Sequence, residues 1–131
     1  MHKTLQPEGW ERPKGYSNGM SATGNSIFVA GQIGWNKDCE IESDDFIEQC
    51  RLALQNILAV LKEAEAGPEH ITRMTWYVTD RQEYLSRGAE LGQVYRELIG
   101  KNFPVMSAVQ VVALMEDRAQ VEIEVTAVKP D

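Results

Sequence analysis

The sequence is poor in the residues from which most metal sites and nucleophilic catalytic sites are built. Its 131 residues include two cysteines and two histidines. His2 is near a chain end, where order is often lost, so a histidine-dependent triad or a histidine-rich zinc site is hard to assemble. Cys39 and Cys50 lack the close spacing of metal-binding cysteine pairs, and we expect both to be reduced thiols. We therefore expect neither a metal nor another cofactor.

Long apolar segments and clusters of positive charge are also missing. No stretch approaches the roughly 20 consecutive apolar residues of a membrane span, and residues 1–10 contain no apolar run typical of signal peptides. We therefore expect a cytoplasmic protein that does not bind membranes. The 13 Lys and Arg are scattered singly, and 20 Asp and Glu give a formal net charge of −7. Nucleic-acid-binding proteins depend on clustered Lys and Arg, so this partner class is disfavoured.

The clearest pattern that is present is a pair of strands near the C-terminal end, residues 104–114 and 120–128. In residues 120–128 apolar and polar side chains alternate, which is typical of a strand with one apolar and one polar face. Glu122 and Glu124 share the polar face. Either this face is solvated, or a partner chain covers it and one carboxylate handles a water molecule or a proton in the resulting cleft.

The rest of the sequence predicts further strands and helices in a single domain, residues 1–131. The other predicted strands are residues 16–23, 26–33 and 71–79. The predicted helices, with apolar residues at three- and four-residue steps, are residues 46–66 and 82–99. Gly24 and Asn25 suit a hairpin turn between the first two strands, residues 1–15 form an extended arm, and residues 115–119 join the last two strands. The order indicates an α+β fold in which two helices cover one face of a mixed sheet.

The other face of this sheet predicts an oligomer. In the strand at residues 104–114, Val105 and Val109 point one way while Met106 and Ala108 point the other. Two helices can cover only one of these faces. An uncovered apolar face on a protein of this size indicates a partner chain.

Several short motifs follow one another in a characteristic order. They are YSNG at residues 16–19, VAGQI at 29–33, TWYVTD at 75–80, VYRE at 94–97 and the pattern FP…SAVQV…VEIEVTAV at the C-terminal end. On these motifs the chain resembles the RidA/YjgF (Rid) superfamily, also named endoribonuclease L-PSP, over nearly its whole length. The resemblance implies a chorismate-mutase-like fold, a homotrimer, and three clefts between subunits that bind small carboxylates.

The resemblance also implies an activity, the hydrolysis of reactive enamines and imines such as 2-iminobutanoate and 2-iminopropanoate. In members with this activity an Arg two residues after a Pro grips the substrate carboxylate. Met106 occupies that position here and offers neither charge nor hydrogen-bond donor. Charged hydrogen bonds contribute about 1.5 to 3 kcal/mol apiece, so their loss would weaken binding of a short 2-imino acid by about ten- to a hundredfold or more.

The remaining positions of the family site are implied residue by residue. Glu122 matches the glutamate that positions the attacking water and is the candidate catalytic residue. The candidate substrate-binding residues are Tyr16, Ser17, Gly31, Tyr95, Met106 and Ser107. Glu122 could instead hold the trimer together, and Tyr16 could be a packing residue. Further candidates are Trp35 and Trp76, for enlarging the cleft, and Arg73 and Arg118, for replacing the lost cation.

Three functions remain open. The first is a homotrimeric hydrolase in which Glu122 orients water onto the carbon of a C=N bond. The second is a trimer that binds a small molecule without chemistry. The third is a ribonuclease, which is disfavoured because the chain is acidic and places no histidine in the expected cleft.

Overall fold

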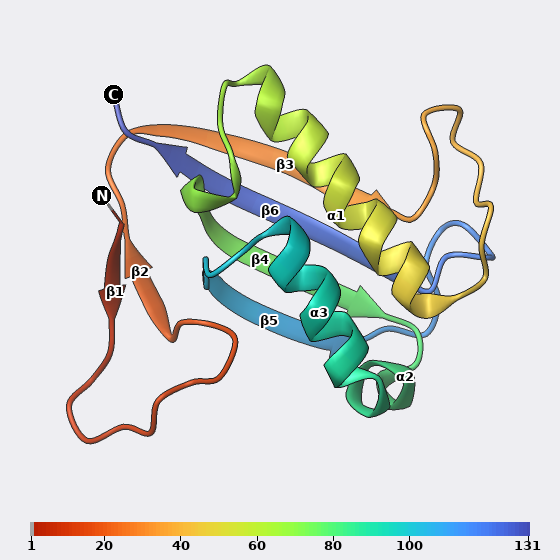
Figure 1. Ribbon diagram of the computed structural model, residues 1–131, viewed down its shortest axis with the longest axis horizontal. Helices are drawn as coiled ribbons and strands as arrows, with labels where there is room; N and C mark the ends of the chain where they lie inside the picture. The colour runs from red at the N-terminus through yellow and green to blue at the C-terminus, as the bar shows by residue number, and fades with distance from the viewer. Residues whose placement is uncertain (1) are drawn as a thin grey trace.

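The main sheet of the computed structural model, which describes residues 2–131, has four strands (Figure 1). They lie in the order β3 (Asn25–Ile33), β6 (Val121–Lys129), β4 (Ile71–Val78) and β5 (Val105–Gln110). Strand β6 is antiparallel to β3 and β4, whereas β4 and β5 are parallel. The sheet is therefore mixed, as predicted.

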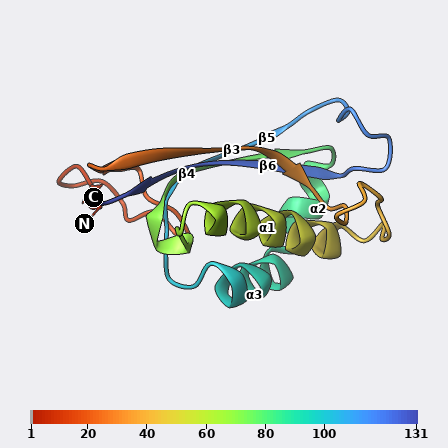
Figure 2. The same cartoon turned by 90° about the horizontal axis from the view of Figure 1, so that it is seen from above.

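Helices cover one face of this sheet. They are α1 (Phe46–Glu63), the short α2 (Arg81–Ser86) and α3 (Gly88–Leu98), and a 3-10 turn η1 (Pro68–His70) leads into β4. Figure 2 shows the layers from the side, with the helices beneath the sheet and its other face open. The predicted α+β architecture is confirmed. Within residues 2–131, no helix combines the length and the apolar character needed to cross a membrane.

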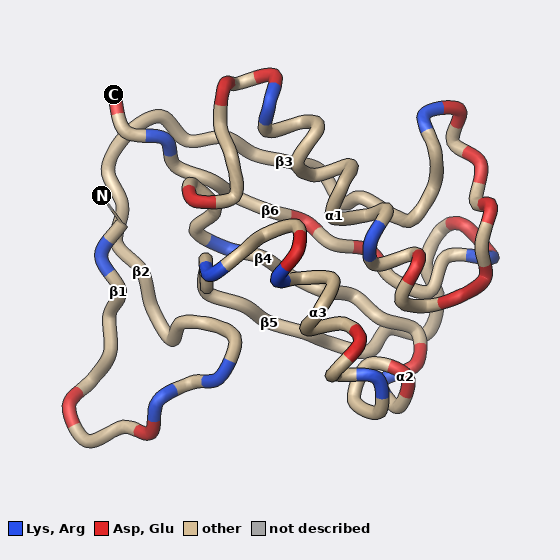
Figure 3. Tube along the Cα trace, in the orientation of Figure 1, with Lys and Arg blue, Asp and Glu red and all other residues tan. Residues whose placement is uncertain are grey.

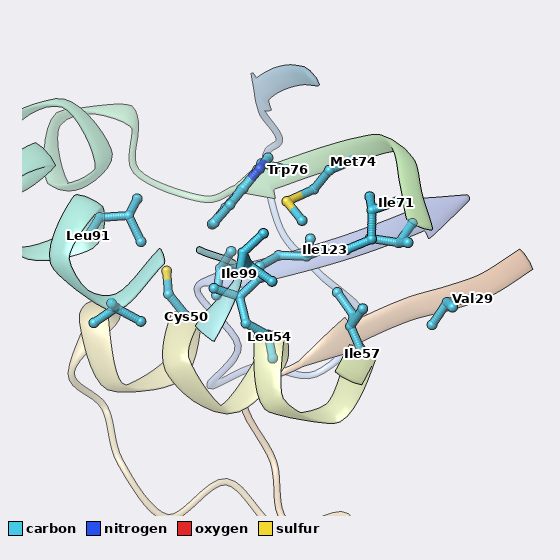
Figure 4. Packing of buried hydrophobic residues seen from close by; sticks show 14 of the residues in the cluster. Val29, Cys50, Leu54, Ile57, Ile71, Met74, Trp76, Leu91, Ile99 and Ile123 are labelled. Atoms are coloured by element: carbon cyan, nitrogen blue, oxygen red, sulfur yellow. The ribbon is translucent and has the colours of Figure 1, made fainter. Parts of the chain in front are cut away.

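The hydrophobic core lies between the sheet and α1 (Figure 4). Helix α1 contributes residues at three- and four-residue steps, among them Cys50, Ala53, Leu54, Ile57 and Leu61, all fully buried. Strand β6 contributes its alternating apolar residues Val121, Ile123, Val125 and Ala127. Glu122 and Glu124 therefore lie on the open face of the sheet, as the alternation predicted.

The N-terminal prediction is wrong in its pairing. Strand β2 (Gly19–Ser21) does not form a hairpin with β3 but pairs with β1 (Lys3–Leu5) in a separate two-stranded sheet, so the predicted extended arm contains a strand. Gly24 has a φ of +146°, and a Cβ there would overlap the carbonyl oxygen of Lys129. The backbone therefore passes close against the end of β6 at this point instead of folding back on itself.

The last two strands are also not neighbours. Strand β4 lies between β5 and β6, so residues 111–120 cross the end of β4 instead of forming a hairpin turn. Strand β5 ends at Gln110, shorter than predicted, and Val112 in the crossover is fully exposed. Strand β5 pairs in parallel with β4, to which it is joined through α2 and α3, and this pairing separates β5 from β6. Parallel pairing cannot be predicted from the alternation of residues within one strand.

The predicted helix at residues 82–99 is interrupted at Arg87. This residue has a φ of −107° and a ψ of 28°, which ends α2 before α3 begins. Its guanidinium binds Asp45, the N-cap of α1, and Glu90 of α3, both at 2.8 Å. The break thus places the cation of Arg87 where α1 and α3 approach each other. Gly88, the next residue, also disfavours one continuous helix through this point.

Candidate functional site

A cavity of about 640 Å³ lies between β5 and the helices α2 and α3. Its volume is in the range of small-molecule sites. Five aromatic residues contribute rings to its walls, namely Tyr16, Trp76, Tyr84, Tyr95 and Phe103. Met106 and Ala108 of β5 form the side made by the sheet.

The register of β5 explains why these two residues face the cavity. Met106 lies beside Met74 and Ala108 beside Trp76 in the parallel β4 strand, and both β4 residues are buried on the helix side. Ser107 lies between them in sequence and therefore points to the open face, beside Thr75. Consecutive residues of β5 thus belong to opposite sides of the sheet.

The aromatic side chains form two pairs. Tyr95 stacks on Phe103 with ring centroids 6.4 Å apart, and its hydroxyl donates to the carbonyl oxygen of Asn102 at 2.7 Å. Burial raises the pKa of the Tyr95 hydroxyl, so it stays a neutral donor. Trp76 and Tyr84 meet edge to face at 6.1 Å. Trp76 is 2% exposed, and its ring nitrogen has no hydrogen-bond partner among residues 2–131.

Positive charge surrounds this cavity. Lys14, Arg96 and Lys101 line it, and none of its described lining residues is Asp or Glu. The ion pairs among residues 2–131 involve other cations. Figure 3 shows acidic residues clustered in the loops before α1 and between β5 and β6, at the other end of the sheet, and further acidic residues on α3 and in the loop between β1 and β2. The cavity is therefore a local cationic site on an acidic protein, suited to an anion.

The sequence-based candidates for a replacement cation do not line this cavity. Arg118 donates to Asp44 at 2.9 Å in the crossover region, and Arg73 lies on β4 outside the cavity. Trp35 also lies elsewhere, at the end of β3, where its carbonyl accepts from Asn56 at 3.0 Å. Of the residues expected to enlarge the cleft, only Trp76 lines it.

A second group of residues lies on the open face, around Glu122. A β-bulge at Ala30 and Gly31 interrupts the pairing of β3 with β6, since Val29 pairs with Val125 and the next pair is Gln32 with Ile123. A Cβ on Gly31 would overlap the carboxylate of Glu122. Glycine at this bulge is therefore what allows the Glu122 carboxylate to rest on the backbone of β3.

The two carboxylates of the open face differ in their contacts. Glu124 accepts a hydrogen bond from the Tyr77 hydroxyl at 2.6 Å. This hydrogen bond raises the pKa of Tyr77, because it favours the neutral phenol. The carboxylate of Glu122 has no hydrogen bond or ion pair with the side chains and backbone of residues 2–131. Its oxygens are free to bind water, a proton or a ligand.

The predicted site residues thus fall into two groups. Tyr16, Tyr95 and Met106 line the cavity on the helix side. Gly31, Glu122 and Ser107 lie on the open face. Within one chain these groups lie on opposite sides of the sheet, and the roles predicted for them stay predictions.

Ser17 belongs to neither group. It is buried, its hydroxyl donates to the carbonyl oxygen of Phe103, and its backbone N–H donates to that of Pro104 at 3.0 Å. Ser17 thus ties the turn at residues 16–19 to the start of β5. A contact between Ser17 and a ligand stays a prediction.

Several residues of the cavity were not predicted from the sequence. They are Lys14, Tyr84, Gly88, Gly92, Arg96, Lys101 and Phe103. One signal was available, because Gly88 and Gly92 are four residues apart in a predicted helix and so share one of its faces. The others come from four separate segments, and their proximity depends on the tertiary fold.

Comparison with known proteins places the chain in a family. The family model described as endoribonuclease L-PSP matches residues 10–129. A RutC family protein of Pyrococcus horikoshii is 34% identical over 131 residues, which cover 98% of this chain and 99% of that protein. The chain belongs to the RidA/YjgF family. Another relative, TdcF of Escherichia coli, is 30% identical over 109 residues, covers 81% of each protein, and carries the provisional name of a reactive intermediate deaminase.

Solved structures of the RidA/YjgF family have the same fold. The Rid protein YyfB of Yersinia pestis, described as of unknown function, has a TM-score of 0.86 at 27% identity and covers 98% of both chains. Rv2704 of Mycobacterium tuberculosis, described as a member of the YjgF/YER057c/UK114 family, has a TM-score of 0.66 at 36% identity and covers 88% of this chain and 87% of its own. The family model is named after a ribonuclease, but this name does not assign that activity to this chain.

Proposed function

We propose that the protein is a Rid-type hydrolase that converts the imine or enamine of a 2-oxo acid into the oxo acid and ammonia. The observation that supports this most directly is Glu122, a carboxylate without a partner among residues 2–131, held over Gly31 on an uncovered sheet face. The deaminase name of the relative TdcF supports the reaction class.

The site we propose lies between subunits of a homotrimer. In one chain Glu122 and the cavity are on opposite sides of the sheet, so a second copy must supply the missing half. The open face carries Phe28, which is 76% exposed, and Val109, which is 46% exposed. Burying these side chains against a neighbouring chain favours assembly. Such an assembly would bring the Glu122 of one subunit to the cavity of the next.

The proposed chemistry needs water and one proton acceptor. Glu122 takes a proton from water as the water oxygen bonds to the imine carbon and the π electrons of the C=N bond move to nitrogen, and Glu122 then gives that proton to the nitrogen. The resulting carbinolamine loses its hydroxyl proton through Glu122 to the nitrogen, the C–N bond breaks, and ammonia leaves as C=O forms. One water is consumed and no oxidant or reductant is required.

Met106 bears on the substrate and not on this chemistry. The cavity cations Lys14, Arg96 and Lys101 are the groups available to attract a carboxylate. Each of these charged groups is at the end of a flexible side chain, whereas an Arg at the position of Met106 would be fixed on a strand of the sheet. We therefore propose a specificity different from that for the short 2-iminobutanoate and 2-iminopropanoate.

The alternative function is a trimeric binding protein without catalysis, which the same cavity would serve. A ribonuclease has less support, because His2 lies beside His70, its Nε2 2.9 Å from the His70 carbonyl oxygen, and neither histidine lines the cavity. We also propose a cytoplasmic location, supported by the free thiols of Cys39 and Cys50.

The test is release of ammonia and oxo acid from freshly generated imines, one short and aliphatic and one aromatic. We expect turnover by the natural protein and a loss of about a hundredfold or more in Glu122→Gln, since general base catalysis contributes about that much. Glu124→Gln is the matched control, on the same strand and face, and should retain activity within about threefold. Ligand binding without turnover across the panel would favour the binding protein, and equal activity of the two variants would remove Glu122 from the mechanism.

A further inference from the structure

We infer that the ligand of the cavity is a planar aromatic carboxylate, larger than a short 2-imino acid. This inference names the substrate class of the proposed hydrolase. It rests on the proposed function only for the reaction that the ligand undergoes. The argument for binding is independent of Glu122, because every group that carries it lies on the helix side of the sheet.

The shape of the cavity depends on two glycines of α3. Gly88 and Gly92 are four residues apart, so they lie on one face of the helix, and both line the cavity. A Cβ at either position would meet no atom within 4 Å, and neither has a positive φ. Nothing within the described chain therefore requires glycine at these positions, although glycine is unfavourable in a helix. What they provide is an open, flat wall that any side chain would fill.

The opposite walls suit a flat apolar ring. Met106 and Ala108 present a thioether and a methyl group in place of a charged side chain. The pairs Tyr95 with Phe103 and Trp76 with Tyr84 add four aromatic rings. In Figure 4 the Trp76 ring extends from β4 toward Leu91 of α3, and both residues line the cavity. Aromatic ligands pack favourably against such rings, edge to face or offset.

The charge of the cavity selects an anion. Lys14, Arg96 and Lys101 line a cavity whose described lining residues include no Asp or Glu, in a chain of net charge −7. Such a site favours a carboxylate over a neutral polar group. The aromatic rings and the positive charge together define an aromatic carboxylate.

The test measures binding of three inert probes to the full-length protein by calorimetry. The probes are 3-phenylpropanoate, propanoate and 3-phenylpropanamide, which separate the aromatic ring from the negative charge. We expect 3-phenylpropanoate to bind at least about tenfold more tightly than either of the others, a difference of about 1.4 kcal/mol. Equal affinity for propanoate would overturn the aromatic part of the inference, and equal affinity for the amide would overturn the anionic part.

Two pairs of variants locate the binding. Gly92→Leu should weaken 3-phenylpropanoate binding by about tenfold or more by filling the cavity, whereas Ala89→Leu, at an exposed position of α3 outside the cavity, should change it by less than about twofold. Lys101→Gln should reduce the preference for acid over amide, with Lys62→Gln on α1 as its control. Circular dichroism verifies that each variant is folded. Unchanged binding in folded Gly92→Leu would place the ligand elsewhere.

The same measurement in Glu122→Gln separates this inference from the proposed reaction. We expect 3-phenylpropanoate to bind at least as tightly in that variant, because Gln keeps the size of Glu and removes a negative charge that would repel the probe carboxylate in the proposed assembly. If no imine is hydrolysed but the probe pattern holds, the hydrolase proposal fails and the ligand class stands. If imines are hydrolysed but the three probes bind alike, the ligand class fails and the hydrolase proposal stands.

Discussion

The two faces of the sheet at the site differ in nearly every respect. The helix side offers a cavity with aromatic walls and three cations, and the open side offers carboxylates on a flat surface. Adjacent residues of one strand, Met106 and Ser107, belong to different faces, as do Ile123 and Glu122. The two-residue repeat of a strand thus separates groups suited to recognition from groups suited to proton transfer. In the site that we propose, one chain contains both halves, and a second copy is needed to bring them together.

The largest expected effect comes from a change on the open face. Gly31→Ala would push the Glu122 carboxylate away from the β3 backbone, because the new methyl group would overlap it. We expect imine turnover to fall by about a hundredfold, since a displacement of about 1 Å of a catalytic group can cost that much. The unfolding midpoint should change little, because a flexible side chain can move aside.

Gly34→Ala is the contrasting control for that prediction. Its Cβ would lie 2.6 Å from the Cα of Gln49, which is fully buried in α1. We expect a loss of about 1 to 3 kcal/mol in the free energy of unfolding, the usual cost of overpacking. Chemical denaturation measures it. A Gly31→Ala protein that keeps full turnover would contradict the role given to the bulge.

A change on the cavity side should have the next largest effect. Met106→Arg would add a fixed guanidinium on β5, and we expect turnover of the short aliphatic imine to rise by about tenfold or more through a lower KM. The aromatic imine should gain less, because the Arg would take up part of the space for the ring. Met106→Leu is the control for volume without charge. An equal gain in both variants would show that charge is not what the site lacks.

A smaller effect is expected from adding a single methyl group to the cavity wall at Gly92, which should increase stability and weaken ligand binding together. Gly92→Ala should raise the free energy of unfolding by up to about 1 kcal/mol, because alanine favours the helix and its methyl group meets nothing. Binding of aromatic acids should weaken at the same time. Denaturation and calorimetry on the same sample measure both. A variant with greater stability and unchanged binding would mean that this glycine has no function in the cavity.

The smallest effect concerns the protonation of the open face. The hydrogen bond to Glu124 raises the pKa of Tyr77, so this phenol should ionise at higher pH in the folded than in the unfolded protein. Its contribution to stability is complete below the unfolded pKa of about 10 and is lost as pH rises through the higher folded value. Difference absorbance titration against Tyr77→Phe isolates this group. In Glu124→Gln the transition should move to lower pH.

The sequence was sufficient for features that depend on local periodicity. The burial of Val121, Ile123 and Val125 and the helix at α1 were predicted because one buried face imposes its repeat on the segment. The pairing of β2 with β1 and the position of β4 between β5 and β6 were not predicted, because pairing depends on contacts between distant segments. The oligomer predicted from the open face stays a prediction.

The candidate site divided in the same way. Glu122 and Gly31 were chosen by family resemblance, and the structure brings them into contact. The cavity cations were missed, because Lys14 and Lys101 are far apart in sequence and each looks like an ordinary solvated side chain. Their shared position depends on the loop before β2 and the segment after α3 meeting at one end of β5.

The attachment of the N-terminal segment has a consequence for how ligand preference can change. Residues 14–16 reach the cavity from outside the main sheet, and Ser17 fastens them to the start of β5 through the carbonyl groups of Phe103 and Pro104. Backbone carbonyls accept these bonds whatever the neighbouring side chains are. Mutations of Lys14 and Tyr16 can therefore alter selectivity with little penalty in folding, whereas Gly15 between them has a φ of +81° and favours glycine. These two positions are the natural place for divergence among descendants and for directed evolution.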